Sequence, residues 1–197
     1  MESKKKIIVY GAGDFGRLVK DLVLQLGHEF AGFIDDNLSG EGILGPYEKA
    51  RGEYNKNEYD VVLAVGYRNL RERWRIFLKL KKDGYQLAPV IHLASYVRSA
   101  ERIGAGSILM ANSVIDYNAQ IQQAVVVWPG AVVNHDTSIG NNSFLSPNCT
   151  VCGFVSMGDS CFVGAGAVIT DHVQVPAETF IKAGCVYSES KDGRRLI

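Results

Sequence analysis

Apolar residues recur at every sixth position from Val97 to Ile181. They are Val97, Ile103, Leu109, Ile115, Ile121, Val127, Val133, Ile139, Leu145, Val151, Met157, Val163, Ile169, Val175 and Ile181. All except Met157 are branched aliphatic residues. A helix repeats about every 3.6 residues and a strand about every 2. A strict period of six is instead typical of a parallel β-helix built from hexapeptides, in which three short walls close a triangular coil.

Small side chains mostly stand two positions before each of these aliphatic residues. They are Ser107, Ser113, Ala119, Ala131, Thr137, Ser143, Cys149, Cys161 and Ala167. We expect the aliphatic residue to point into a narrow prism and the small one to leave room for the next wall. The flat sides of such a prism are exposed and commonly associate, so we expect a closed homo-oligomer, with a homotrimer as the first choice.

The first part of the chain has a different pattern. Lys6–Tyr10 is a short apolar run typical of a buried strand, and Gly11-Ala12-Gly13-Asp14-Phe15-Gly16 follows at once. An amphipathic helix and a second strand, His28–Ile34, come next and end at Asp35 and Asp36. This βαβ order with G-x-G-x-x-G matches the dinucleotide-binding fingerprint, in which backbone N–H groups at a helix N-terminus approach phosphates. Glycines needed only for a tight turn are the alternative explanation.

The rest of this first part of the chain, which we call the head, also alternates between predicted strands and helices. We expect a connecting loop over Ser39–Asn57, a strand over Tyr59–Val65 that ends at Gly66, a helix over Asn69–Asp83, and a last strand over Leu87–His92. Such a head is too short for the two mononucleotide halves that bind a whole dinucleotide. It suits a mononucleotide-type ligand better than NAD.

Composition narrows the classes of partner. The 197 residues contain 21 Lys and Arg and 21 Asp and Glu, and zero net charge argues against nucleic acid or an anionic membrane as a partner. No apolar N-terminal run resembles a signal peptide or a span, so we expect a cytoplasmic protein. Cys149 and Cys152 lack a second pair or a nearby histidine, so no zinc site is predicted. The predicted domains are residues 1–92 and 93–197.

His135 is the candidate for chemistry in the repeats. Asp136 is adjacent and could hold the imidazole in one tautomer. Gly153 stands one coil later at the same place, so its backbone N–H would lie one rung away, about 4.8 Å. A base beside a backbone donor is a plausible layout for acyl transfer, whereas a surface histidine at a coil corner is the alternative. His135 has no neighbouring histidines in sequence, and no metal is expected.

A second pair one coil apart is Ala165 and Ala183. These small side chains could let an extended cofactor arm lie along the prism, or could simply make a tight corner.

These motifs together resemble the bacterial sugar O-/N-acetyltransferases. The resemblance rests on Gly11–Arg17, on Gly32-Phe33-Ile34-Asp35-Asp36 and on a hexapeptide prism that carries Asn134-His135-Asp136. That family includes the sialic acid O-acetyltransferase type and the acetyltransferases of nucleotide-linked 4-amino-sugars. The resemblance implies an α/β Rossmann-like N-terminal domain, a C-terminal left-handed parallel β-helix of hexapeptide repeats, a trimer, a nucleotide-sugar substrate and acetyl-CoA as co-substrate.

The resemblance also implies roles for individual residues. His135 would be the general base, Asp136 its carboxylate, and Gly153 the N–H donor to the thioester carbonyl. Asp35 and Asp36 would contact the base or ribose, and Gly11, Gly13, Asp14, Phe15 and Gly66 would lie near the phosphates and sugar. Ala165 and Ala183 would line the pantetheine arm.

Three places depart from the pattern of that family. Phe15 and Phe144 stand where many members have histidine, and Ala183-Gly184-Cys185-Val186-Tyr187 replaces the usual Gly-hydrophobic-Pro-Ala-Lys. The first expectation is an N-acetyltransferase of a nucleotide-linked 4-amino-4,6-dideoxy sugar that serves surface-glycan synthesis. O-acetylation of sialic acid or another sugar, and a non-catalytic trimeric nucleotide-sugar-binding protein, are the alternatives.

Overall fold

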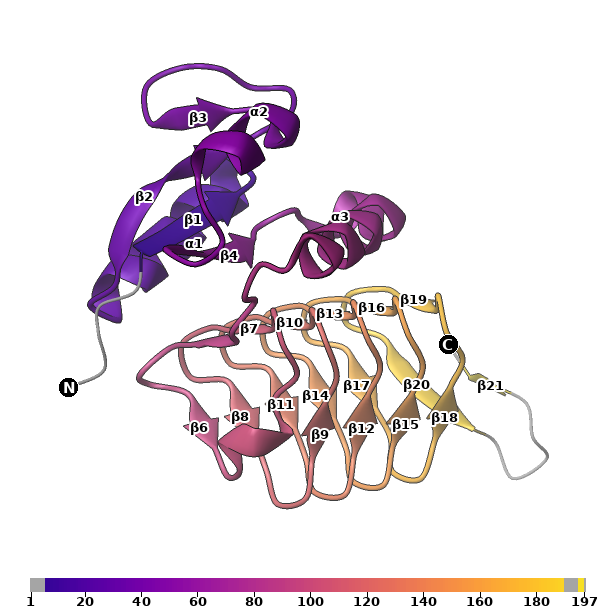
Figure 1. Ribbon diagram of the computed structural model, residues 1–197. Helices are drawn as coiled ribbons and strands as arrows, with labels where there is room; N and C mark the ends of the chain where they lie inside the picture. The colour runs from indigo at the N-terminus through magenta and orange to yellow at the C-terminus, as the bar shows by residue number, and fades with distance from the viewer. Residues whose placement is uncertain (1–5, 190–194, 197) are drawn as a thin grey trace. The chain divides into compact units, whose positions relative to one another are not determined.

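The computed structural model describes residues 6–189 and 195–196, and it divides into two compact units between Val90 and Ile91. This division falls two residues before the boundary expected from the sequence. The first unit is a small α/β domain, and the second is a stack of coils (Figure 1).

A four-stranded parallel sheet in the order β3-β2-β1-β4 forms the centre of the α/β unit. Its strands are β1 (Lys6–Tyr10), β2 (Glu29–Ile34), β3 (Ile43–Gly45) and β4 (Tyr59–Leu63). Since β2 and β4 flank β1, the chain reverses its direction of travel across the sheet between β1 and β4. In open α/β sheets such a switch point, at the carboxyl ends of the strands, is where ligands bind.

The described part of this unit contains three α-helices and one 3₁₀ turn. They are α1 (Asp14–Gln25), α2 (Tyr47–Glu53), the 3₁₀ turn η1 (Tyr67–Asn69) and α3 (Leu70–Asp83). The Asn69 side chain caps α3 by accepting from the Glu72 N–H, and Gly84 ends it at φ 87°. The buried residues of α3 are Arg73, Ile76, Phe77 and Leu80, so its inner face includes an arginine.

Two expected elements of the head were wrong. The segment Ser39–Asn57 is not a plain loop, because it contains β3 and α2. Strand β3 is three residues long and too short to show a periodic pattern. The strand expected over Leu87–His92 is reduced to β5 (Val90–Ile91), which pairs with β7 in the stack of coils rather than with the head sheet.

The second unit is a parallel β-helix with three walls. Wall 1 contains β5, β7 (Ile108–Leu109), β10 (Val126–Val127), β13 (Phe144–Leu145), β16 (Phe162–Val163) and β19 (Phe180–Ile181). Wall 2 contains β6 (Tyr96–Val97), β8 (Val114–Ile115), β11 (Val132–Val133), β14 (Thr150–Val151), β17 (Val168–Ile169) and β20 (Val186–Glu189). Wall 3 contains β9 (Gln120–Ile121), β12 (Ser138–Ile139), β15 (Ser156–Met157) and β18 (Gln174–Val175). The turn η2 (Ala100–Arg102) precedes wall 3, and β21 (Arg195–Leu196) pairs antiparallel with β20.

The period of six forms the core of the prism, as predicted. Every aliphatic of the series from Ile103 to Ile181 is at most 7% exposed, and Val97 at the first coil is half-buried. The series continues for one more step, because Tyr187 stands six residues after Ile181 and is 1% exposed. The apolar column thus ends on an aromatic ring.

The small residues before the aliphatics also connect the coils. Thr137 Oγ1 donates to the carbonyl of Cys152 (2.8 Å) and accepts from the N–H of Val155 (3.2 Å). Ser107 makes the same two bonds with Gln122 and Val125. These hydroxyls satisfy backbone groups of the next coil that would otherwise be buried without partners.

The first prediction concerns the core column. Ile139→Ala should destabilise the β-helix by about 2–5 kcal/mol, because the fully buried side chain leaves a cavity that neighbouring coils cannot fill. Urea unfolding followed by circular dichroism measures this effect. Ser138→Ala, on the outward side of the same strand, is the control, and equal losses for the two variants would contradict the inward placement.

Candidate functional site

His135 lies at a corner of the prism, in the turn between β11 and β12. The corner joins wall 2 to wall 3, and 48% of the His135 side chain is exposed. Its Nδ1 lies 3.1 Å from Oδ2 of Asp136. Because an ionised carboxylate can only accept, Nδ1 carries the proton in this pair, and in the neutral imidazole Nε2 then has the free lone pair. The imidazole is therefore oriented as a general base requires.

Asp136 is itself held from the preceding coil. The amide Nδ2 of Asn118, eighteen residues earlier, donates to Asp136 Oδ1 over 2.7 Å. The hydrogen bond from Asn118, followed by the one from His135, holds the pKa of Asp136 below its ordinary value. Asp136 therefore stays ionised and keeps its orientation toward the imidazole.

Gly153 lies directly beneath the imidazole, one coil after His135. A Cβ at Gly153 would come within 2.7 Å of His135 Cε1 and 3.0 Å of Nε2, so a larger residue would displace the ring. The N–H of Gly153 donates to no other residue of the described chain. The structure thus brings His135, Asp136 and Gly153 together, as the sequence predicted. It also shows why position 153 is a glycine, since any larger residue would collide with the imidazole.

Two aromatic rings beside His135 were missed by the sequence analysis. The N–H of Phe154 donates to the carbonyl of His135 (3.2 Å), and its ring centroid lies 5.2 Å from the imidazole at an angle of 85°. The His172 ring stacks on the Phe154 ring, with centroids 4.7 Å apart and planes nearly parallel at 5°. The spacing of eighteen between Asp136, Phe154 and His172 was the signal that could have revealed this column.

Ala165 and Ala183 lie on a different corner. They fall between wall 1 and wall 2, and the N–H of Gly184 donates to the carbonyl of Ala165 (2.9 Å), which stacks the two corners. Both alanines are exposed. Within one chain, His135 and the alanines therefore stand at opposite edges of wall 2. Their place in a cofactor site stays a prediction.

The glycine loop of the head turns at the end of β1. Gly11 has φ 113°, and a Cβ there would lie 2.6 Å from the carbonyl oxygen of Ala64, at the end of β4. A Cβ at Gly16 would collide with the carbonyl of Gly11. Gly13 has open space around it and immediately precedes α1. Close packing therefore explains Gly11 and Gly16, whereas Gly13 leaves the N-terminus of α1 accessible.

Asp35 fastens this loop to the second strand. Its Oδ2 accepts from the N–H of Ala12 (2.9 Å), and its Oδ1 accepts from the N–H groups of Asn37 and Leu38. Burial by itself would raise the pKa of Asp35, but these three backbone donors outweigh it and hold the pKa below the ordinary value. Asp35 is thus an anchor between β1 and β2.

Asp36 is engaged in a similar way. It accepts from the hydroxyl of Tyr10 (2.5 Å) and from the backbone N–H of Tyr47 (2.8 Å), and the two tyrosine rings stack with centroids 5.7 Å apart. Burial and the Asp36 carboxylate both raise the pKa of Tyr10 well above its usual range. Contact of either acid with a nucleotide stays a prediction, since each already has partners within the head.

The remaining head residues surround the start of α1 and the end of β4. Asp14 is exposed in the first turn of α1 and pairs with Arg17, whereas Phe15 is half-buried. Gly66 immediately precedes η1, on the β4 side of the switch point, and has open space around it. Gly11, Gly13 and Gly66 therefore gather at one edge of the sheet, where the fold predicts a ligand.

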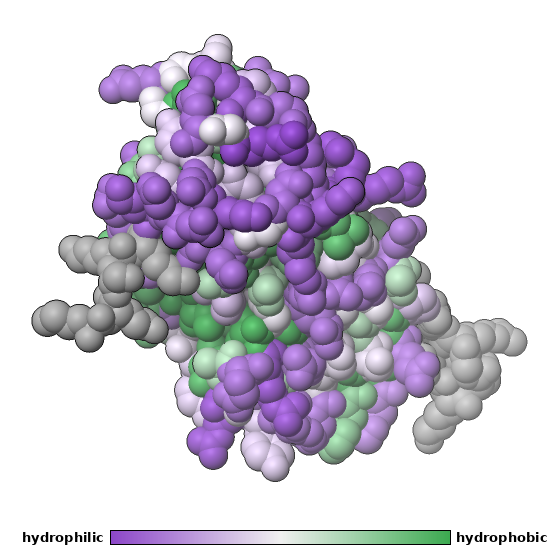
Figure 2. Space-filling view, viewed as in Figure 1, coloured by the Kyte–Doolittle hydropathy of each residue, from purple (hydrophilic) through white to green (hydrophobic). Residues whose placement is uncertain are grey.

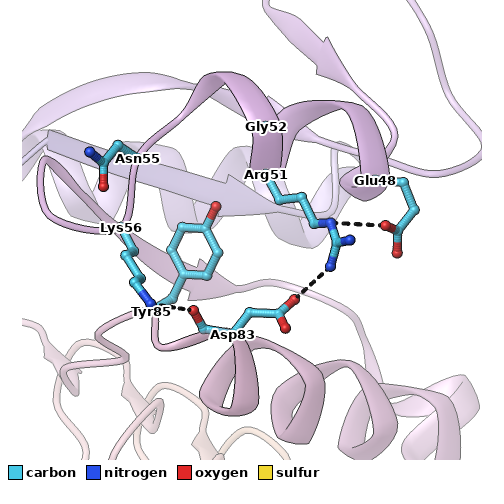
Figure 3. Close-up of a pocket in the computed structure, with 7 residues that line it drawn as sticks. All are labelled: Glu48, Arg51, Gly52, Asn55, Lys56, Asp83 and Tyr85. Carbon is cyan, nitrogen blue, oxygen red and sulfur yellow. Dashed lines mark hydrogen bonds and ion pairs between the residues drawn. The ribbon is translucent and has the colours of Figure 1, made fainter.

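A separate hollow of about 730 Å³ lies between α2 and the end of α3 (Figure 3). Its lining residues are Glu48, Arg51, Gly52, Asn55, Lys56, Asp83 and Tyr85. Arg51 pairs with Glu48 (3.0 Å) and Asp83 (3.4 Å), and Lys56 donates to the carbonyl of Asp83 (3.1 Å). Because its charges compensate one another, this hollow offers no anion site to a phosphate.

In residues 6–189 and 195–196, His, Cys, Asp and Glu side chains nowhere gather in threes as a metal site would require. The helices described there are too short or too polar to cross a membrane. The cytoplasmic location expected from the sequence stays a prediction.

Two sequence families match the chain in succession. The PglD N-terminal domain matches residues 6–78, and the bacterial transferase hexapeptide, a unit of six repeats, matches residues 118–153 and 136–171. Residues 6–78 are thus similar to a PglD N-terminal domain, and residues 118–171 are similar to bacterial transferase hexapeptide repeats. The predicted architecture, a Rossmann-like α/β domain followed by a left-handed β-helix, is therefore confirmed.

Several solved structures are similar to this one over nearly the whole chain. The acetyltransferase domain of PglB from Neisseria gonorrhoeae FA1090 is 24% identical with a TM-score of 0.84, and the match covers 98% of this chain and 100% of that one. The same domain in complex with acetyl coenzyme A gives a TM-score of 0.76 at the same identity and coverage. PerB from Caulobacter crescentus, in complex with CoA and GDP-perosamine, is 24% identical, with a TM-score of 0.84 and coverage of 98% and 97%. At this identity the likeness establishes the fold, with the α/β domain followed by the β-helix along the chain.

The second prediction tests the anchoring role of Asp35. Asp35→Asn should lower the melting temperature at pH 7, because asparagine keeps only one accepting oxygen, whereas Asp35 accepts from three backbone N–H groups through both of its oxygens. A carboxyl with a lowered pKa contributes stability above its ordinary value of 3.8 and loses it as the pH falls through the folded value. Thermal unfolding between pH 7 and pH 3 should therefore show the wild-type and variant curves converging in acid.

Asp21→Asn, an exposed carboxylate of α1, is the control for this experiment and should leave the melting temperature unchanged. A gap between wild type and Asp35→Asn that persists unchanged at pH 3 would contradict the anchoring role.

Proposed function

We propose that this chain transfers an acetyl group from acetyl-CoA to the amino group of a nucleotide-linked 4-amino-4,6-dideoxy sugar, in the synthesis of a surface glycan. The observation that carries the proposal is the oriented His135, with Asp136 at Nδ1 and Gly153 beneath the ring, on a hexapeptide transferase prism. PerB, of the same fold, was solved with CoA and GDP-perosamine, and this supports an acceptor of that chemical class.

The reaction needs two proton transfers, one from the attacking amine and one to the departing sulfur. The amine nitrogen attacks the thioester carbonyl carbon, the carbon–sulfur bond breaks, and CoA leaves as its thiol. His135 Nε2 takes the proton that the amine loses and can return it to the departing sulfur. Asp136 stabilises the imidazolium that forms in between, because its carboxylate lies 3.1 Å from Nδ1.

Negative charge builds up on the thioester oxygen during attack. A backbone N–H held in a rigid turn stabilises such charge without reorganisation. Gly153 suits this role because its N–H has no acceptor within the described chain and because the coil fixes it beside His135.

The nucleotide part of the acceptor would bind the head. The first N–H groups of an α-helix have no acceptors within the helix and favour phosphate. Helix α1 begins next to Gly13, which leaves this end open, and Gly66 faces the same edge from β4. Asp35 and Asp36 support this edge through Ala12 and Tyr10, whether or not they also touch the base or ribose.

Phe144 motivates the non-catalytic alternative. It is 4% exposed and belongs to an aromatic row on wall 1, with Trp128 at 5.9 Å and Phe162 at 6.0 Å. It therefore supplies no second titratable group. A nucleotide-sugar-binding protein would bind its ligand without needing acetyl-CoA, which separates that alternative from an enzyme.

The third prediction is catalytic. Thiol release from acetyl-CoA should be observed with one of a panel of UDP-, dTDP- and GDP-linked 4-amino-sugars, and His135→Ala should lower kcat about 10²–10⁴-fold through loss of the base. His28→Ala, which lies just before β2 at the opposite edge of the head sheet, is the control and should retain full activity. Release with free sialic acid instead would favour the O-acetylation alternative, and binding of nucleotide sugar without release would favour the binding protein.

The fourth prediction is steric. Gly153→Ala should also lower kcat, by at least about tenfold, although it removes no chemical group, because its Cβ would displace the imidazole. Gly52→Ala, which meets nothing within 4 Å, is the matched control. Equal activity of Gly153→Ala and wild type would show that the position of the ring over Gly153 is irrelevant to turnover.

We also propose that the β-helix forms a homotrimer. Wall 2 presents apolar outward side chains that the chain itself does not bury, together with one threonine: Tyr96, Val114, Val132, Thr150, Val168 and Val186. On wall 1, Ile108, Val126 and Phe144 are already buried within the chain, whereas Phe162 and Phe180 remain accessible. Wall 3 instead presents Gln120, Ser138, Ser156 and Gln174. Figure 2 shows apolar side chains among polar ones on the face of this unit turned toward the viewer. A three-fold ring needs two different contact surfaces on each copy, and the apolar row of wall 2 would supply one of them.

The fifth prediction follows from the contrast between the apolar outward residues of wall 2 and the polar ones of wall 3. Light scattering should give the mass of three chains for the wild type. Val168→Glu on wall 2 should dissociate the trimer, because the new charge would be buried against a neighbour, whereas Ser156→Glu on wall 3 should leave it intact. A wild-type monomer would contradict the proposal.

A further inference from the structure

Phe154 adopts a conformation that is unfavourable for its residue type. One residue in each corner of the prism has left-handed φ. These residues are Gly106, Asn112, Asn118, Ala124, Gly130, Asp136, Asn142, Asn148, Phe154, Ser160, Gly166, His172, Glu178 and Gly184. Most are glycine or asparagine, which tolerate this region, whereas a bulky aromatic residue there is uncommon and strained. Phe154 nevertheless has φ 58°.

Core packing does not account for the aromatic ring of Phe154. The residue is 48% exposed, while the interior of the same coil is already filled by Val151 and Val155. Its ring lies edge-on to the imidazole of His135 and face-to-face with His172. A strained and half-exposed aromatic residue beside a candidate base indicates a binding role rather than a structural one.

We infer that Phe154 is a specificity-determining residue that recognises the apolar C6 methyl group of the acceptor sugar. This inference rests on the proposed function. In a 4-amino-4,6-dideoxyhexose the reacting nitrogen is on C4, and the methyl group projects from the adjacent C5. A sugar whose amine reaches His135 therefore carries its apolar group within a few bonds of the base. The Phe154 ring, centred 5.2 Å from the imidazole, offers an apolar surface at that distance.

The ring of His172 packs against the ring of Phe154. Its nearly parallel stack, 4.7 Å from Phe154, limits the positions that the aromatic ring can take. The N–H of His172 donates to the carbonyl of Gly153, so the support is continuous with the coil that carries the candidate oxyanion donor. His172 is thus a positioning residue, and Phe154 is the residue that touches the sugar.

The test uses two acceptors that differ only at C6. One is a nucleotide-linked 4-amino-4,6-dideoxyhexose, and the other is the 4-amino-4-deoxyhexose with a C6 hydroxyl. The two acceptors differ by one hydroxyl, and a hydrophobic site discriminates against an added hydroxyl by about tenfold or more in kcat/KM. We expect the wild type to prefer the 6-deoxy acceptor by at least this factor, Phe154→Asn to lose the preference and Phe154→Tyr to keep it.

Phe154→Asn also separates function from folding. Asparagine tolerates left-handed φ, so this variant should melt no lower than the wild type while it loses selectivity. Glu178→Asn, at φ 60° in a different corner, relieves the same kind of backbone strain away from His135 and should keep the preference. Retained preference in Phe154→Asn, or no preference in the wild type, would overturn the inference.

Failure of acetyl transfer would be seen separately, as absence of thiol release by the wild type with every acceptor. In that case the same comparison is made by calorimetry with the two nucleotide sugars in the presence of CoA. If the wild type binds the 6-deoxy sugar with the lower Kd and Phe154→Asn binds both sugars equally, the role of Phe154 is still supported. Equal Kd values for the two sugars in the wild type would overturn it.

Discussion

The stack of coils depends on one local constraint, which is that each corner turns through a residue with left-handed φ. From Gly106 to Gly184 this residue recurs at every sixth position without a break. A regular corner gives walls of equal length, so residues eighteen apart lie in register on successive coils, as Val132 and Thr150 do. The aliphatic column then fills the prism because its members always follow the corner by the same number of residues.

The same register places the candidate chemistry. Asn118, Asp136, Phe154 and His172 belong to one column of corner residues, and Tyr117, His135, Gly153 and Asp171 belong to the column beside it. A hydrogen bond from one coil to the next orients the carboxylate of Asp136, and a glycine on the following coil makes room for the imidazole. A rigid repeat can therefore hold a base and a backbone donor in fixed positions with few residues committed to the task.

The head uses a different physical device. Its open edge is maintained by carboxylates that accept from backbone N–H groups, since Asp35 joins the glycine loop to β2 and Asp36 joins β1 to the start of α2. These bonds leave the N-terminus of α1 accessible beside Gly13. The acids thus have a structural reason to stand at the end of β2, in addition to the nucleotide contact predicted for them.

The sequence by itself determined the architecture, because a period of six over eighty-five residues and a βαβ unit with a glycine fingerprint each have few physical solutions. It also placed Gly153 beside His135, since a coil of eighteen residues converts sequence distance into adjacency. Only the tertiary structure decided which partners satisfy Asp35 and Asp36, that α2 and β3 interrupt the expected loop, that Arg73 faces inward, and that His135 and Ala165 occupy different corners. Some of these outcomes depend on contacts between residues far apart in the chain, such as Ala12 with Asp35 at 23 positions and Tyr10 with Asp36 at 26. Others depend on the direction in which a side chain points. Neither kind of information leaves a periodic signal in the sequence.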